Sequence, residues 1–66
     1  MDSQKLKGKM REKSKTYQDV AEAIGVSITT INDKLNGKRK IYVEEAQAIS
    51  NLLDLSNDER VSIFLN

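Results

Sequence analysis

The segment from residue 27 to residue 36 carries short hydrogen-bonding side chains at spacings that gather them on one side of a helix. These side chains are Thr29, Asn32 and Asp33. All three form helices poorly, and a helix selected for stability alone would place Ala, Glu, Lys or Gln at exposed positions. Asn can pair bidentately with adenine, Thr can hydrogen-bond a base or touch a thymine methyl group, and Asp can accept from cytosine. The pattern therefore favours a helix whose outer face reads the edges of bases.

Two of these positions have a second interpretation. Ile28 stands at the leading edge of the segment, where it either touches a thymine methyl group or packs half-buried against the preceding helix. Asp33 either contacts a base or forms a salt bridge with Arg39, and we favour the salt bridge. Ile31 and Leu35 lie one turn apart and are expected to face the protein interior.

A short helix and a sharp turn come before this segment and would hold it in place. Ala21 is small enough to lie where two helices cross, Gly25 can take a positive φ at little cost, and Val26 fills the turn. An ordinary helical hairpin would share parts of this pattern. The joint pattern, with caps at both ends, indicates a helix-turn-helix, in which one helix enters a DNA groove.

The whole chain, residues 1–66, reads as one all-α domain of five short helices, because Pro is absent and helix-forming residues dominate. We expect the helices at residues 2–13, 16–25, 27–36, 43–53 and from 56 onward. Thr16 with Asp19, and Ser56 with Glu59, have the spacing of capping boxes. The residues expected to face inward from the last two helices are Val43, Ala46, Ile49, Leu52, Leu53, Val61, Phe64 and either Ile63 or Leu65.

Composition narrows the possible functions. His and Cys are both absent, so the chain has neither a disulfide nor a His/Cys metal site, and we expect no cofactor. The carboxylates fall on faces expected to be solvated and no Gly-rich phosphate loop is present, which argues against an enzyme. No apolar run approaches the ~20 residues of a membrane span, and no signal peptide appears. We therefore expect a soluble, intracellular protein.

Charge is segregated along the chain. Residues 1–40 carry ten basic and five acidic side chains, a net charge of +5, whereas residues 41–66 carry one basic and five acidic side chains, a net charge of −4. A solvated surface is the simplest interpretation, but the segregation indicates that one part of the molecule attracts polyanions. The scattered aromatic residues form no stacking platform for RNA. Double-stranded DNA is the expected partner.

With these residues described, the segment TYQDVAEAIGVSITTINDKLNGK resembles the Cro/CI-type helix-turn-helix family of phage and bacterial regulators, with its lambda-repressor-like five-helix domain. The chain is most similar in layout to the small phage Cro-type repressors. The resemblance implies a homodimer that binds a palindromic operator and represses transcription in the bacterial cytoplasm. The base contacts that it implies come from Ser27, Ile28, Thr29, Asn32 and Asp33. The phosphate contacts that it implies come from Thr16, Tyr17, Lys38, Arg39 and Lys40.

Two positions depart from the family pattern. Tyr17 stands where relatives often have a Gln that contacts a phosphate, so either its hydroxyl replaces that amide or its ring packs on the first helix. Lys34 stands where many relatives have an apolar residue.

A single recognition helix touches too few base pairs for useful selectivity, which a twofold pair of chains on a pseudo-palindrome provides. The dimer contact must lie away from the basic residues. We expect it at the tail, residues 61–66, and at the start of the fourth helix, through Tyr42, Ile63, Phe64 and Leu65. The alternative function is a protein-interaction module, such as an antitoxin, which would bind a partner protein through the acidic C-terminal part of the chain and through Ile63, Phe64 and Leu65.

Overall fold

Over residues 1–65, which the computed structural model describes, the chain forms five short α-helices and no strand. In chain order the helices are α1 (Ser3–Glu12), α2 (Tyr17–Ile24), α3 (Ile28–Leu35), α4 (Val43–Leu52) and α5 (Asn57–Phe64). The predicted all-α fold of five helices is confirmed.

Polar residues in front of the helices satisfy the free N–H groups of the first turns. In front of α2, the Thr16 hydroxyl accepts from the Asp19 N–H at 3.2 Å, and the Asp19 carboxylate accepts from the Thr16 N–H at 2.8 Å. These bonds hold the pKa of Asp19 below its usual value. Ser56 and Glu59 form the same reciprocal pair in front of α5. Both predicted capping boxes are confirmed, and each cap contributes about 1 kcal/mol of stability.

A glycine in the left-handed region ends each of the two central helices, and the one at Gly25 is expected from the sequence. Gly25 follows α2 with φ +74° and Gly37 follows α3 with φ +79°. The Gly37 N–H donates to the Lys34 carbonyl at 3.3 Å, and the Lys38 N–H donates to the Asp33 carbonyl at 2.8 Å. These two bonds form the Schellman motif that closes α3 and directs the chain into the loop before α4.

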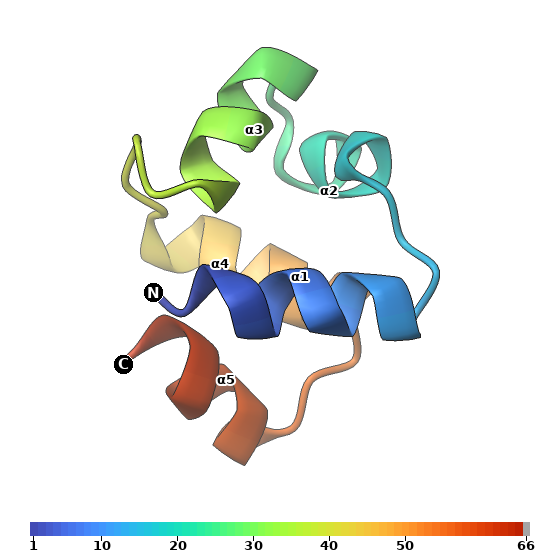
Figure 1. Cartoon of the computed structure of the whole chain (residues 1–66), viewed down its shortest axis with the longest axis vertical. Coiled ribbons are helices and arrows are strands. Elements are labelled where there is room, and N and C mark those ends of the chain that lie inside the picture. The colour runs from blue at the N-terminus through green and yellow to red at the C-terminus, as the bar shows by residue number, and fades with distance from the viewer. Residues whose placement is uncertain (66) are drawn as a thin grey trace.

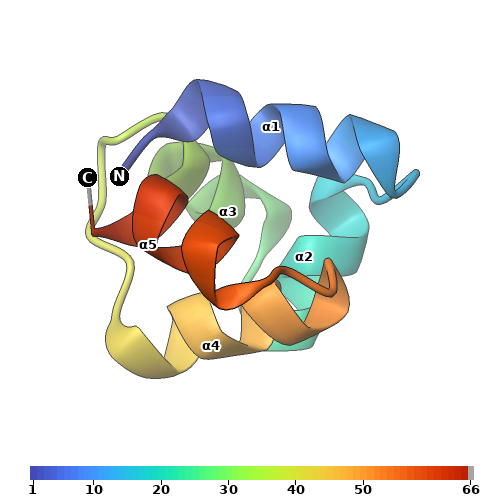
Figure 2. The same cartoon turned by 90° about the horizontal axis from the view of Figure 1, so that it is seen from below.

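The helix pair α2–α3 occupies one end of the molecule and α5 the opposite end, with α1 and α4 between them (Figure 1). Helix α2 packs against both α3 and α4, while α1 packs against α3 and α5. The start of the chain lies beside α5 (Figure 2), where the Asp2 N–H donates to the Ile63 carbonyl at 2.7 Å. All five helices therefore belong to one packed unit, from which α3 projects at one end.

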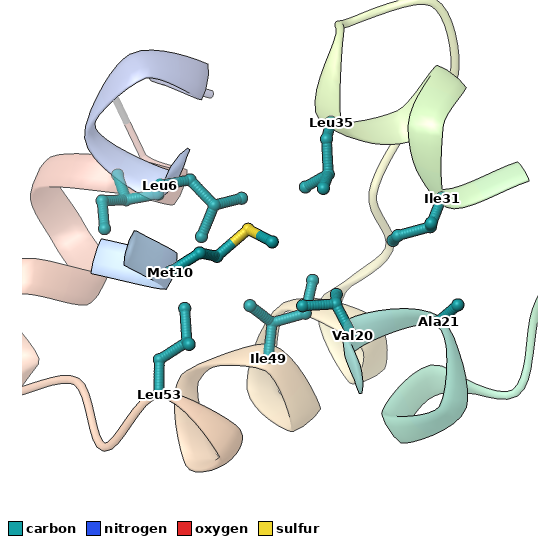
Figure 3. Packing of buried hydrophobic residues seen from close by; sticks show 9 residues of the cluster. Leu6, Met10, Val20, Ala21, Ile31, Leu35, Ile49 and Leu53 are labelled. Atoms are coloured by element: carbon teal, nitrogen blue, oxygen red, sulfur yellow. The ribbon is translucent and has the colours of Figure 1, made fainter. Parts of the chain in front are cut away.

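A cluster of nine buried apolar side chains holds the helices together. Its members are Leu6, Met10, Val20, Ala21, Ile31, Leu35, Ile49, Leu53 and Ile63. Figure 3 shows side chains from α1, α2, α3 and the end of α4 converging on one interior. The rim residues Tyr17, Ile24 and Val26 pack against this cluster and are partly buried. The inner face of α3, formed by Ile31 and Leu35, is thus anchored as the sequence predicts.

Two residues predicted to face the core lie on the surface instead. Val43 is 79% exposed and Val61 is 54% exposed. Each step of three residues falls about 60° short of a full helical turn, so Val43 lies about 120° around α4 from the buried Ile49. On α5 the buried residue is Ile63, at 2% exposure, and Val61 faces away from it. The inward assignments of Val43 and Val61 are therefore wrong.

A surface ion pair joins α1 to α5. The Lys9 ammonium lies 2.8 Å from a carboxylate oxygen of Glu12 and 2.6 Å from one of Glu59. The hydrogen bond from Lys9, together with one from the Ser56 N–H, lowers the pKa of Glu59 from 4.5 to about 2. Because the folded pKa lies below the unfolded value, the stabilisation from Glu59 is present above about pH 4.5 and is lost as the pH falls toward 2.

We expect Glu59→Gln to lower the melting temperature at pH 7, and the difference from wild type to close as the pH falls from about 5 to about 2. The difference closes because the wild-type carboxyl itself becomes neutral in this range. Circular dichroism at 222 nm across a pH series measures it. Glu44→Gln is the matched control, since the Glu44 carboxylate has no ion pair within the described chain. A pH-independent difference for Glu59→Gln would contradict a stabilising role for the pair.

Candidate nucleic-acid interface

The outer face of α3 presents the predicted reading residues to solvent. Thr29 and Asn32 are exposed, and Ile28 is 47% exposed, which leaves nearly half of it free to touch a ligand. Ile31 and Leu35 occupy the opposite face and are fully buried. The helix therefore separates anchoring side chains from side chains that are free to bind.

Two predicted base-contacting residues are engaged within the protein. The Ser27 hydroxyl accepts from the Thr30 N–H at 3.1 Å and lies 3.0 Å from the Thr30 hydroxyl, so it caps α3. The Asp33 carboxylate pairs with Arg39 at 3.5 Å. This is the salt bridge favoured from the sequence, and it ties the loop after α3 back to the helix. Thr29 and Asn32, with Ile28, are left as the outward-facing residues.

A short chain of side-chain hydrogen bonds runs from α1 to the outer face of α3. The Lys7 ammonium donates to Oδ1 of Asn36 at 2.7 Å. Nδ2 of Asn36 donates to the Asn32 carbonyl at 2.8 Å and to Oδ1 of Asn32 at 3.2 Å. From the sequence, Asn36 is expected only to end the recognition helix. No local pattern marks its link to Lys7, which lies in another helix.

Lys34, noted as a departure from the family pattern, is buried with 5% exposure on the inner side of α3. Its ammonium donates to the Lys40 carbonyl and to the Glu45 carboxylate, each at 2.9 Å. It also lies 5.2 Å from the centre of the Tyr42 ring, within cation–π range. Lys34 thus joins α3 to Lys40, in the loop after α3, and to Glu45, at the start of α4. Its spacing of three residues from Ile31 is the sequence signal for an inward position.

The carboxylate that receives Lys34 is itself held in its charged form. Burial raises the pKa of Glu45, but the hydrogen bond from the Tyr42 N–H, at 3.0 Å, and the bond and charge of Lys34 outweigh burial. The net result is a pKa below the usual value. The buried Lys34 ammonium is therefore paired with the charge of the partly buried Glu45, whereas a buried lysine without a partner would carry a large free-energy cost.

Basic side chains flank α3 on two sides. The exposed side chains of the loop after α3 are Lys38, Arg39 and Lys40. On the other side, an open groove of about 160 Å³ is lined by Lys7, Met10, Arg11, Lys15 and Tyr17. Thr16 uses its own N–H and hydroxyl in the capping box. The Tyr17 ring packs against the core and also borders this groove.

The residues predicted for a dimer contact are only partly brought together. Tyr42 and Leu65 are exposed and Phe64 is partly buried, but Ile63 belongs to the core and is removed from the predicted contact. Asn66, the last residue of the predicted tail, lies outside the described residues. An open groove of about 390 Å³ separates α4 from α5, and its apolar lining is formed by Val43, Ala46, Val61, Phe64 and Leu65.

Within residues 1–65, no helix is long and apolar enough to cross a membrane, and no group of acidic side chains is placed to hold a metal ion. Two short helices at a glycine turn, an anchored α3 with an outward polar face, and basic flanks together define a helix-turn-helix DNA-binding protein. A helix-turn-helix family model matches residues 6–59, and the chain belongs to this family, the XRE family of Cro/CI-type regulators. The protein is a DNA-binding transcription regulator. No curated protein and no solved structure matches the chain.

The basic loop makes a testable contribution to binding. Replacing both Lys38 and Lys40 with Ala should weaken binding to every duplex by a similar factor, because phosphate contacts carry no sequence information. The slope of log K against log salt should flatten by about 0.9 for each phosphate that the variant no longer neutralises. Fluorescence anisotropy at several salt concentrations measures both effects. Lys5→Ala is the charge control, since the Lys5 ammonium donates to the Ser62 hydroxyl of α5, at the end of the molecule opposite α3. An unchanged slope for the double variant would show that the loop does not contact the phosphate backbone of the DNA.

Proposed function

We propose that the protein is a Cro-like repressor that binds a palindromic operator as a dimer, with α3 in the major groove. The observation that carries this proposal is the division of α3 into a buried face, Ile31 and Leu35, and an exposed face, Thr29 and Asn32. A helix held by its inner face can enter a groove as a rigid body, and its outer side chains then meet base edges.

The positions of the basic side chains support the same docking. Lys38 and Lys40 follow the C-terminal end of α3, while Arg11 and Lys15 lie near the start of α2. Phosphates on the two sides of a groove would be met by these two groups, which fix the register of α3 without reading sequence. Thr16 and Tyr17 adjoin the second group and complete the proposed phosphate contacts.

The apolar groove between α4 and α5 supports association of two copies. Val43, Val61 and Leu65 are exposed there, and the groove lies on elements that bear the negative part of the sequence. Two such faces would bury each other and leave both α3 helices free. Val43 and Val61 thereby join Tyr42, Phe64 and Leu65 as the proposed contact. A partner protein, as in an antitoxin, is the competing occupant of this groove.

Repression follows from occupancy of the operator in the bacterial cytoplasm, because two copies bound in successive major grooves exclude other proteins from the same DNA. We assign the protein no catalytic role and no cofactor.

Selection of binding sites from a random DNA pool tests the reading face. Wild type should enrich a pseudo-palindrome with half-sites about 10 bp apart. Thr29→Ala and Asn32→Ala should each keep the helical content but lose ~1–3 kcal/mol of discrimination at particular base pairs. Gln18→Ala, an exposed polar change on α2, is the control for helical content. Enrichment of the same site by all four proteins would remove α3 as the reader.

The stoichiometry on DNA tests the dimer. Sedimentation with the selected operator should find two chains per duplex for wild type. Val61→Gln should leave the fold intact, because Val61 is exposed, but should favour one chain per duplex at the same concentration. Ala23→Gln changes an exposed residue of α2 outside the groove and should behave as wild type. One chain per duplex for wild type, with full selectivity, would contradict the dimer and leave the groove to another partner.

A further inference from the structure

The neighbours of Asn36 determine which atom of its side-chain amide donates a hydrogen bond and which accepts one. The Lys7 ammonium can only donate, so the atom of Asn36 that it meets at 2.7 Å must be the oxygen. The backbone carbonyl of Asn32 can only accept, so the atom of Asn36 that it meets at 2.8 Å must be the nitrogen. Both neighbours therefore require the same orientation of the Asn36 amide.

This orientation is passed on to Asn32. Nδ2 of Asn36 also lies 3.2 Å from the Asn32 side chain, and a donor at that position must face the Asn32 oxygen, Oδ1. Because the amide is planar and its Oδ1 faces Asn36, the Nδ2 of Asn32 points away from Asn36. No acceptor among residues 1–65 takes a hydrogen bond from this Nδ2, and Asn32 is exposed on the outer face of α3. The group that Asn32 offers to a ligand is consequently a donor.

We propose that Asn36 is a positioning residue for base selection: its bond to Asn32 turns the Asn32 Nδ2 donor toward the DNA, so that Asn32 selects a base with a major-groove acceptor. The inference rests on the proposed reading role of α3. Purines offer N7 as an acceptor, with O6 added in guanine, and thymine offers O4, whereas cytosine offers only its amino donor. Asn32 should therefore favour guanine, adenine or thymine over cytosine at its base position. Lys7 keeps Asn36 in the required orientation from α1.

Reversing the direction of the hydrogen bond between Asn36 and Asn32 provides the test. Asn36→Asp replaces the donor by a carboxylate, which still accepts from Lys7 but can now only accept from Asn32. The Asn32 amide should turn over, directing Oδ1 to the DNA, and cytosine should then be preferred over guanine at the same base position. We expect the guanine-to-cytosine ratio at that position to change by at least about fivefold, the equilibrium effect of one hydrogen bond. The base position is the one whose preference Asn32→Ala abolishes.

The measurement is site selection from a random DNA pool by wild type, Asn36→Asp and Asn36→Ala, with circular dichroism to verify helical content. Asn51→Asp is the matched control: it makes the same change of charge at an exposed position on α4 and should keep the wild-type preference. Asn36→Ala should weaken the preference without reversing it, and it decides the question if Asn36→Asp does not fold. A wild-type preference retained in both Asn36 variants would overturn the positioning role while leaving α3 as the reader. Failure of wild type to select any sequence would overturn the proposed function as well.

Discussion

The structure depends on one small apolar interior that must fix five helices at once. Each helix is eight to ten residues long, which is too short to be stable alone in water. No disulfide is available, because the chain has no Cys. Every helix therefore contributes to the same nine-residue cluster or ends beside it. Truncation of any side chain in this interior would affect every helix, since all of them share it.

This constraint explains how a polar, weakly helix-forming segment such as α3 stays folded. Ile31 and Leu35 attach it to the interior, and two polar links attach its C-terminal half to its neighbours. Lys34 reaches Glu45 at the start of α4, and Asn36 reaches Lys7 on α1. These contacts hold the helix from behind and from both sides, while Thr29 and the Nδ2 group of Asn32 stay exposed on its outer face. The low helix propensity of α3 is therefore compensated by its tertiary contacts.

The sequence allowed correct predictions only for features that depend on residues close together in the chain. The caps at Thr16 and Ser56, the turn at Gly25 and the inward pair of α3 depend on residues within a turn of each other, and all were correct. The inward assignment of Val43 was wrong, because apolar residues spaced three apart move steadily around the helix and do not stay on one face. The partners of Lys34 and Asn36 could not be predicted, because they lie in other helices and only packing brings them together. Base and phosphate contacts remain predictions that depend on DNA.

The contact between Asp2 and Ile63 has a consequence for how the molecule opens. This contact closes a loop of about 60 residues, and loop closure costs about 4 kcal/mol of chain entropy that the contacts between α1 and α5 must offset. Because contacts between residues far apart in the sequence form slowly, we expect α1 and α5 to pair late in folding. Since Leu6 and Met10 of α1 share the interior with Ile31 of α3, loss of the contact between Asp2 and Ile63 would loosen α3 as well. Under the proposed docking of α3, cleavage within α5 would therefore weaken DNA binding, although α5 lies at the end of the molecule opposite α3.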